Sequence, residues 1–136
     1  MRQHITKKDG AAYIDDSYNA SPDSMKAGLS VLCQMPADYR IAVLADMLEL
    51  GENTKEYHRQ VGEYAGQSKV DELLLYGELA GYIGYGAEQY IGKIKHFDTL
   101  RDITEYLKAE IKPGTAVLFK GSRGMKLNEV VDGLLG

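Results

Sequence analysis

The sequence has little that would hold a protein together covalently or place it in a membrane. Cys33 is the single cysteine among 136 residues, so the chain can form no internal disulfide and offers no cysteine pair to zinc. No apolar run approaches the roughly 20 residues that span a bilayer. No basic segment followed by an apolar core resembles a signal peptide. These absences favour a reducing compartment, and we expect a cytoplasmic protein without a membrane span.

The chain also lacks an excess of positive charge. Its 16 Lys and Arg residues are outnumbered by 20 Asp and Glu residues, which gives a net charge of −4 and argues against a nucleic-acid surface. A single nucleotide is not excluded by this balance. Hydrophobic residues make up 44% and charged residues 26%, a composition typical of globular proteins. We therefore expect residues 1–136 to form one folded domain.

Sequence patterns of self-contained active sites are missing as well. The chain contains no Gly-x-x-x-x-Gly-Lys-Ser/Thr phosphate loop, and no Gly-x-Gly-x-x-Gly fingerprint follows its first strands. No Ser-His-Asp or Cys-His arrangement can be defended from the sequence. The polar residues described below therefore indicate one half of a binding site rather than a complete catalytic centre.

Apolar runs that alternate with helix-period segments are the main pattern that is present. The expected strands are residues 11–15, 40–46, 72–77, 94–97 and 115–121, and an opening strand pairs with the first of these through an Asp9-Gly10 turn. Several runs are almost continuously apolar, as in strands that are covered on both faces. The alternation predicts an α/β fold, with a mostly parallel sheet, helices on both faces and an N-terminal β-hairpin.

Capping residues mark where the helices begin. Ser21 is placed to cap the first helix, with Pro22 at its first position. Two later signals resemble capping boxes, Asn53 with Glu56 and Thr99 with Asp102. One expected helix near residue 80 is weakened by three glycines, Gly81, Gly84 and Gly86.

The loop after the first long strand, DDSYNASP, carries unusually many polar groups. Ligands of parallel sheets lie beyond the carboxyl ends of the strands. Here Asp16 can accept hydrogen bonds from a ribose diol, Asn19 offers donors and acceptors, and Tyr18 offers a flat ring and a hydroxyl. The alternative is that Asp15 and Asp16 only solvate the strand end while Ser21 caps the helix.

Two further loops fall at the same edge of the expected sheet. In ADMLELGEN, Asp46 and Glu49 can orient an ammonium group or a metal-bound water, although two acids without a third ligand are a weak metal signal. In KGSRGMK, backbone amides and the cations of Lys120 and Arg123, with the Ser122 hydroxyl, favour an anion such as phosphate or carboxylate. The alternative for this last loop is a flexible basic turn on an acidic protein.

Three motifs resemble the C-terminal domain of the Mur ligases: DDSYNASPDSM, LADMLELGENTKEYHRQVGEYA and LFKGSRGMKLNEVV. The resemblance runs from about residue 10 to the end, and the first motif is similar to that of the family member that adds a dipeptide. It implies a Rossmann-like three-layer sandwich and the last part of a three-domain cytoplasmic enzyme of peptidoglycan synthesis. The absent domains would hold the UDP-sugar peptide and, on a P-loop, ATP with Mg²⁺.

The resemblance also implies a reaction and a set of site residues. ATP would convert the carboxylate of UDP-MurNAc-tripeptide into an acyl phosphate, which the amine of D-Ala-D-Ala then attacks. Asp16 would hold the ribose of ATP, and Tyr18, Asn19 and Ser21 would border the nucleotide, although Ser21 stands where many relatives have Asn. The dipeptide and the transferring phosphate would lie near Asp46, Glu49, Lys120, Ser122 and Arg123. No catalytic residue and no metal ligand is expected in this chain alone.

Two other functions fit the same sequence. One is the C-terminal domain of a related amide ligase, such as a folylpolyglutamate synthetase. The other is a free-standing nucleotide- or ligand-sensing module. Because the phosphate loop is missing, we expect the chain by itself to be inactive as a ligase.

Overall fold

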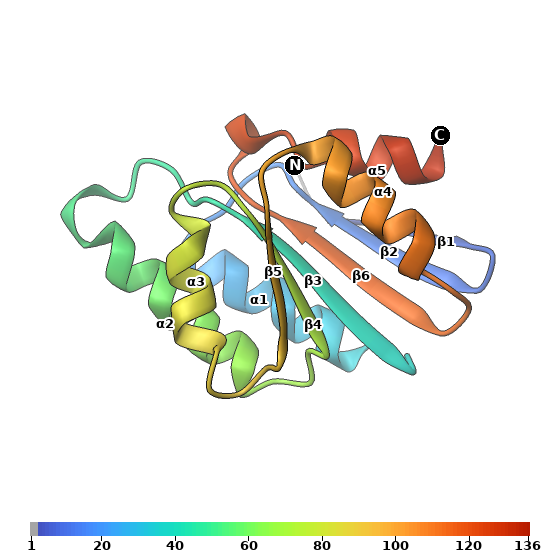
Figure 1. Cartoon of the computed structure of the whole chain (residues 1–136), viewed down its shortest axis with the longest axis horizontal. Coiled ribbons are helices and arrows are strands. Elements are labelled where there is room, and N and C mark those ends of the chain that lie inside the picture. The colour runs from blue at the N-terminus through green and yellow to red at the C-terminus, as the bar shows by residue number, and fades with distance from the viewer. Residues whose placement is uncertain (1–2) are drawn as a thin grey trace.

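The computed structural model describes residues 3–136, and Figure 1 follows the chain through its elements. The strands are β1 (His4–Lys8), β2 (Ala11–Asp16), β3 (Tyr39–Ala45), β4 (Glu72–Tyr76), β5 (Lys93–Phe97) and β6 (Thr115–Lys120). The α-helices are α1 (Pro22–Gln34), α2 (Thr54–Gly66), α3 (Ala80–Ala87), α4 (Leu100–Glu110) and α5 (Asn128–Leu135). Two short 3₁₀ turns, η1 (Gly51–Asn53) and η2 (Arg123–Met125), complete the elements. No helix of this described part is long and apolar enough to cross a membrane.

The strands form one sheet in the order β1-β2-β6-β3-β4-β5. β1 pairs antiparallel with β2, and every other neighbouring pair is parallel. The hairpin turns at Asp9 and Gly10, whose φ angles of 52° and 80° lie in the left-handed region that Asp-Gly turns favour. The predicted mostly parallel sheet with an N-terminal hairpin is confirmed.

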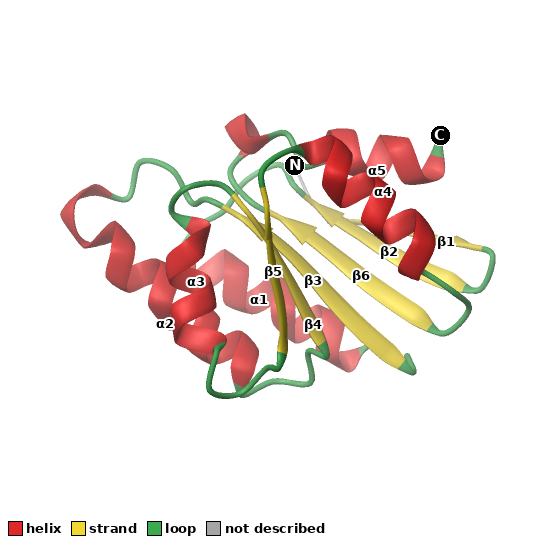
Figure 2. Ribbon diagram, viewed as in Figure 1, coloured by secondary structure: helices red, strands yellow, loops and turns green. Residues whose placement is uncertain are grey.

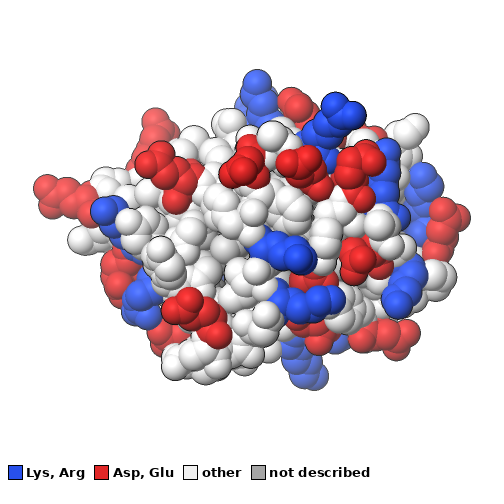
Figure 3. Space-filling model, viewed as in Figure 1, with Lys and Arg blue, Asp and Glu red and all other residues white. Residues whose placement is uncertain are grey.

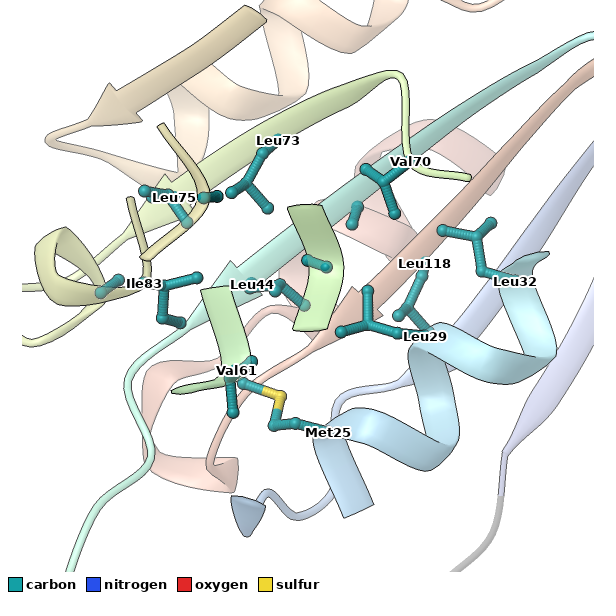
Figure 4. Close-up of a cluster of buried hydrophobic side chains, with 14 of the residues drawn as sticks. Met25, Leu29, Leu32, Leu44, Val61, Val70, Leu73, Leu75, Ile83 and Leu118 are labelled. Carbon is teal, nitrogen blue, oxygen red and sulfur yellow. The ribbon is translucent and has the colours of Figure 1, made fainter. Parts of the chain in front are cut away.

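Helices cover both faces of the sheet, as Figure 2 shows. Along each central strand, successive side chains point to opposite faces: Leu44 and Leu118 pack with α1, α2 and α3, whereas Val43 and Val117 pack with α4 and α5. In Figure 4, Met25 from α1 lies beside Val61 from α2 over the first of these faces. The predicted three-layer arrangement is therefore confirmed.

The helix-start signals have different outcomes. Ser21 caps α1 as predicted, since its side chain accepts a hydrogen bond from the Ser24 amide and the Ser24 hydroxyl accepts one from the Ser21 amide. Thr99 caps α4 by accepting from the Asp102 amide, but the Asp102 side chain makes no return bond, so only half of the predicted capping box forms among the described residues. The prediction for Asn53 is wrong: η1 runs directly into α2, so Asn53 lacks the extended backbone of a cap and its side chain makes no capping bond.

The order of strands creates a place where neighbouring connections diverge. The chain leaves β2 and β3 for α1 and α2, which pack on one face of the sheet. It leaves β6, which lies between them, for α5 on the other face. Diverging connections of this kind mark the switch point of the sheet, and ligands of α/β sheets bind at the carboxyl ends of the strands beside such a point.

The opposite edge of the sheet holds a buried carboxylate. Glu72, the first residue of β4, is fully buried and accepts hydrogen bonds from the hydroxyls of Tyr39 and Tyr106. The Lys93 ammonium lies 3.8 Å from the same carboxylate. Burial, and then the hydrogen bond to Glu72, raise the pKa of both Tyr106 and Tyr39. The cluster ties α4 to the amino ends of β3 and β4.

Because the pKa values of Tyr106 and Tyr39 are raised, we expect the free energy of unfolding to fall in alkaline solution. Because their folded-state pKa values lie above the unfolded value of about 10, their contribution is complete below that pH and is lost as the pH rises through the folded values. Tyr106→Phe should therefore flatten the decline of the free energy of unfolding above pH 10 and should cost about 1 kcal/mol at neutral pH. Urea unfolding from pH 7 to pH 11 measures both effects. The mostly exposed Tyr85 provides the control Tyr85→Phe, and an equal response of the two variants would contradict this account.

Candidate functional site

Three loops meet at the carboxyl edge of the sheet. We call them the first loop (residues 15–21, including the end of β2), the second loop (46–53, after β3) and the third loop (120–126, including the last residue of β6). Their strands are neighbours in the order β2-β6-β3, so the third loop lies between the other two. The sequence placed all its candidate site residues in these loops, and the fold brings them to one edge.

A buried ion pair joins the first and third loops. Asp16 and Lys120 lie beside each other in the register of β2 and β6, and the Lys120 Nζ is 2.8 Å from the Asp16 Oδ2. Lys120 also donates to the backbone carbonyl of Asn19 at 3.0 Å. The side chain of Lys120 is 3% exposed and that of Asp16 is 18% exposed. Lys120 therefore points into the protein, whereas Asp16 keeps access to the surface.

An exposed pair joins the same two loops further out. The Arg123 guanidinium stacks over the Tyr18 ring at 4.8 Å from its centroid, and Nη1 donates to the Tyr18 hydroxyl at 3.3 Å. Tyr18 is 38% exposed. This arrangement places an aromatic ring and a cation together at the surface of the two loops, which suits a planar or anionic ligand.

The remaining candidates of the first loop serve the loop itself. The Asn19 Oδ1 accepts from the Ala20 amide at 2.8 Å, and within residues 3–136 no hydrogen bond uses the amide nitrogen of this exposed residue. Ser21 uses its hydroxyl in the α1 cap. Sequence reasoning missed Ser17, which is buried and bonds to the Asp15 carboxylate through its amide and its hydroxyl. The closely spaced Asp and Ser signal such a turn.

The second loop divides its two acids between the interior and the surface. Asp46 is 6% exposed, and its Oδ1 accepts from the Ala80 amide at 2.7 Å, where α3 begins. Glu49 is exposed and has a φ of 62°. Of these two acids, Asp46 is buried and Glu49 is exposed.

The second and third loops are hydrogen-bonded to each other. The Ser122 amide donates to the Asp46 carbonyl at 2.9 Å, and the Ser122 hydroxyl accepts from the Leu48 amide at 2.7 Å. His58 of α2 supports the second loop from below, accepting from the Met47 amide through Nε2 and donating from Nδ1 to the Thr54 carbonyl. His58 is fully buried, so it acts as a packing and hydrogen-bonding residue beneath this loop.

The side chains of this edge do not fit a metal centre. Within residues 3–136, no group of three or more His, Cys, Asp or Glu side chains is placed to hold a metal ion. The Asp46 carboxylate already accepts from the Ala80 amide, and Glu49 belongs to no group of three possible ligands among the described residues. No step of a reaction is therefore assigned to a metal held by this chain.

Comparison with known proteins identifies the family. The model of the Mur ligase, glutamate ligase domain, matches residues 1–123. The chain belongs to the Mur ligase family. The fold and the order of the three loops agree with the resemblance predicted from the motifs, and the chain corresponds to the C-terminal domain of these ligases.

Two bacterial relatives share the name of a tripeptide–D-alanyl-D-alanine ligase. UDP-N-acetylmuramoyl-tripeptide–D-alanyl-D-alanine ligase of Bacillus subtilis (strain 168) is 37% identical over 139 residues, which cover 99% of this chain and 30% of the relative. The enzyme of the same name from Escherichia coli (strain K12) is 37% identical over 123 residues, covering 89% and 26%. The chain thus spans about 30% of the length of the B. subtilis relative.

Solved Mur ligase structures share the fold closely. The MurF ligase of Thermotoga maritima, solved in complex with ADP, is 30% identical with a TM-score of 0.82, over 96% of this chain and 29% of that one. MurF of Acinetobacter baumannii is 28% identical with a TM-score of 0.84, over the same shares of the two chains. The similarity to both covers almost the whole described fold.

Proposed function

We propose that this chain acts as the C-terminal domain of an ATP-dependent ligase that joins D-Ala-D-Ala to UDP-MurNAc-tripeptide. The observation that carries the proposal is the 37% identity to a dipeptide-adding ligase over 99% of the chain. The three loops at the switch point of the sheet supply the matching half-site. In this proposal the domain closes over the nucleotide and positions the incoming dipeptide. The ligase acts in the cytoplasm.

The first loop provides the nucleotide side of the proposed site. Asp16 keeps part of its carboxylate at the surface, where it accepts the ribose hydroxyls of ATP. Tyr18 and Asn19 lie exposed beside it, and Ser21 contributes through the start of α1. The ADP in the related T. maritima structure supports nucleotide binding in this family.

The second and third loops provide the dipeptide and phosphate side. Arg123 is exposed and carries a charge that suits the dipeptide carboxylate or the developing phosphate charge. Glu49 is exposed on the facing loop and suits the ammonium group of the dipeptide. Asp46 and Ser122 act from within: Ser122 bonds the third loop to the second, and the Asp46 side chain bonds the second loop to the start of α3. Lys120 differs from these residues because its ammonium is already paired.

The chemistry then divides between this domain and the rest of the ligase. The tripeptide carboxylate takes the γ-phosphoryl group of ATP and releases ADP. The amine of D-Ala-D-Ala attacks the acyl carbon, gives up a proton, and the C–O bond to phosphate breaks as the amide forms. Magnesium and the phosphate loop belong to the central domain in this proposal. Closure of a separate domain excludes water from the labile acyl phosphate and orients the amine.

The test is ADP release by the natural protein that contains this chain, with UDP-MurNAc-tripeptide, in the presence and absence of D-Ala-D-Ala. We expect ADP release to require the dipeptide. Release that depends instead on glutamate and a folate would favour a folylpolyglutamate synthetase. Nucleotide binding without any turnover would favour a sensing module. Either of these last two results would overturn the proposal.

The chain alone should not catalyse ligation. It has no phosphate loop, and its described residues offer no metal centre, so the phosphoryl transfer lacks its machinery. The purified chain, incubated with ATP, Mg²⁺, the tripeptide precursor and D-Ala-D-Ala, should give no amide product by mass spectrometry. Turnover by the purified chain would contradict the half-site interpretation.

A further inference from the structure

We propose that Lys120 is a positioning residue for Asp16, and that Gly28 of α1 provides the space for this pair. The proposal rests on the function above, in which Asp16 faces the ribose of ATP. It assigns to Lys120 a role through another side chain instead of a direct contact with dipeptide or phosphate. The unit combines one residue each from β2, β6 and α1.

The surroundings of Lys120 argue against direct contact with a ligand. Its side chain is 3% exposed, and its ammonium group reaches two acceptors, the Asp16 Oδ2 at 2.8 Å and the Asn19 carbonyl at 3.0 Å. Two of its three N–H donors are thus committed within the protein. An anion bound at the three loops would have to draw this ammonium away from both partners.

The bonds of Asp16 leave one oxygen for a ligand. Oδ2 accepts from Lys120 and, at 3.5 Å, from the Gln3 side chain. Among residues 3–136, no hydrogen bond reaches Oδ1. Lys120 therefore fixes the orientation of the carboxylate through one oxygen while the other is free to accept from a ribose diol. Pairing also offsets the negative charge of Asp16, which would otherwise repel the phosphates of the same nucleotide.

Gly28 lies against the pair from the side of α1. A Cβ at this position would lie 2.9 Å from the Lys120 Cδ and 3.2 Å from the Asp16 Oδ2. A methyl group there would press on both members of the pair at once. Gly28 is buried in the second turn of the helix, where alanine would otherwise be the better residue. The ion pair supplies a physical reason for glycine at this position.

The first experiment separates the two substrates of the ligase. In the natural protein that contains this chain, Lys120→Met should raise the KM for ATP about tenfold and leave the KM for D-Ala-D-Ala unchanged. Methionine keeps the length of the apolar stem and removes the charge. A raised KM for the dipeptide with an unchanged KM for ATP would mean direct contact, and would overturn the proposal.

A double-mutant cycle tests whether Lys120 acts through Asp16. Asp16→Asn should also raise the KM for ATP, and adding Lys120→Met to it should change that KM by less than about twofold. Effects of the two substitutions that multiply would mean independent roles. They would overturn the proposal even if each variant alone were impaired.

Gly28→Ala tests the unit without removing a charge. We expect the KM for ATP to rise about threefold to tenfold while the thermal midpoint of unfolding stays within a few degrees of the wild type. Gly81→Ala is the matched control, since Gly81 is also helical and a Cβ there would meet no atom within 4 Å. If the two alanine variants had the same KM for ATP, Gly28 would have no part in the unit.

Failure of the proposed function would be visible separately. It would appear as ADP release by the wild type that does not depend on D-Ala-D-Ala. The unit would then be tested on this chain through urea unfolding of Asp16→Asn, Lys120→Met and the double variant. If the changes in the urea midpoint caused by the two substitutions were not additive in the double variant, the pairing of Lys120 with Asp16 would be supported. Additive changes would overturn it.

Discussion

Gly62→Ala is expected to destabilise the chain by about 3 kcal/mol, at the upper end of what overpacking usually costs. A Cβ on Gly62 would lie 1.8 Å from the Ile83 carbonyl oxygen and 2.7 Å from the Ile83 carbonyl carbon. These are backbone atoms of α3, so no side-chain rotation relieves the clash. Only a separation of α2 from α3 makes room, and that would disturb the core around Val61 and Ile83.

The contact between these helices has a second glycine on the other side. A Cβ on Gly86 of α3 would lie 1.9 Å from the Arg59 carbonyl oxygen and 2.9 Å from the Glu63 nitrogen in α2. Each helix thus presents a glycine to the backbone of the other. Gly86→Ala should therefore cost a similar free energy, and the double variant should lose less than the sum, because one separation of the helices relieves both clashes.

The measurement is the free energy of unfolding of each variant from urea titration of this chain. Gly81→Ala is again the control, because Gly81 lies in α3 with Gly86 but faces open space. It should raise the free energy of unfolding by about 0.5–1 kcal/mol through helix propensity alone. If Gly62→Ala and Gly81→Ala both stabilised the chain, the close approach of α2 and α3 would be refuted.

The glycines of α3 show what sequence reasoning could and could not extract. Helix propensity alone makes all three of them a weakness of this segment. In the fold, Gly86 is a contact point between helices, while Gly81 makes no comparable contact. Propensity is a local quantity, whereas the need for glycine arises from α2, more than twenty residues away in the chain. The sequence predicted that the helix exists but not why it tolerates glycine.

The candidate site was predictable to the level of its loops. The polar residues at the carboxyl ends of β2, β3 and β6 could be placed together, because the carboxyl ends of parallel strands lie at the same edge of a sheet. The direction of each side chain depends on register and on the helix above it. Lys120 therefore looked like an anion-binding cation in the sequence, while in the fold it is buried with Asp16.

The buried cluster at the other edge of the sheet was missed for a similar reason. Glu72 opens an otherwise apolar strand, and its partners Tyr39 and Tyr106 come from distant segments of the chain. No local spacing connects the three residues. Figure 3 shows the contrasting behaviour of the other charges: on this face of the molecule, acidic and basic side chains are interspersed at the surface. Composition gives the number of charges but does not show that the carboxylates of Glu72 and Asp46 are buried.

The ion pair at the site leads to the second large expected effect. Asp16→Ala should destabilise this chain by about 3 kcal/mol or more, because it leaves the Lys120 ammonium buried with the Asn19 carbonyl as its remaining acceptor. Lys120→Met should cost only about 1 kcal/mol. The methionine fills the space of the lysine stem, and water can reach the partly exposed Asp16 carboxylate.

This asymmetry follows from burial and not from the distance between the charges. A pair at 2.8 Å loses the same Coulomb attraction whichever partner is removed. What differs is the charge that stays behind: the Lys120 side chain is 3% exposed, and that of Asp16 is 18% exposed. Urea unfolding at neutral pH should therefore give a higher free energy of unfolding for Lys120→Met than for Asp16→Ala. The double variant should be more stable than Asp16→Ala alone, because the stranded charge is gone.

The reverse order would carry a definite meaning. If Lys120→Met were the more damaging change, the carboxylate would be the member that depends on its partner, and Lys120 would be held in place mainly by the Asn19 carbonyl. Charge reversal at an exposed position offers a control for general electrostatics. Glu88→Lys, at the end of α3 and away from the three loops, should shift the free energy of unfolding by less than about 0.5 kcal/mol. A large shift in that control would assign the losses at Asp16 to net charge and not to the buried pair.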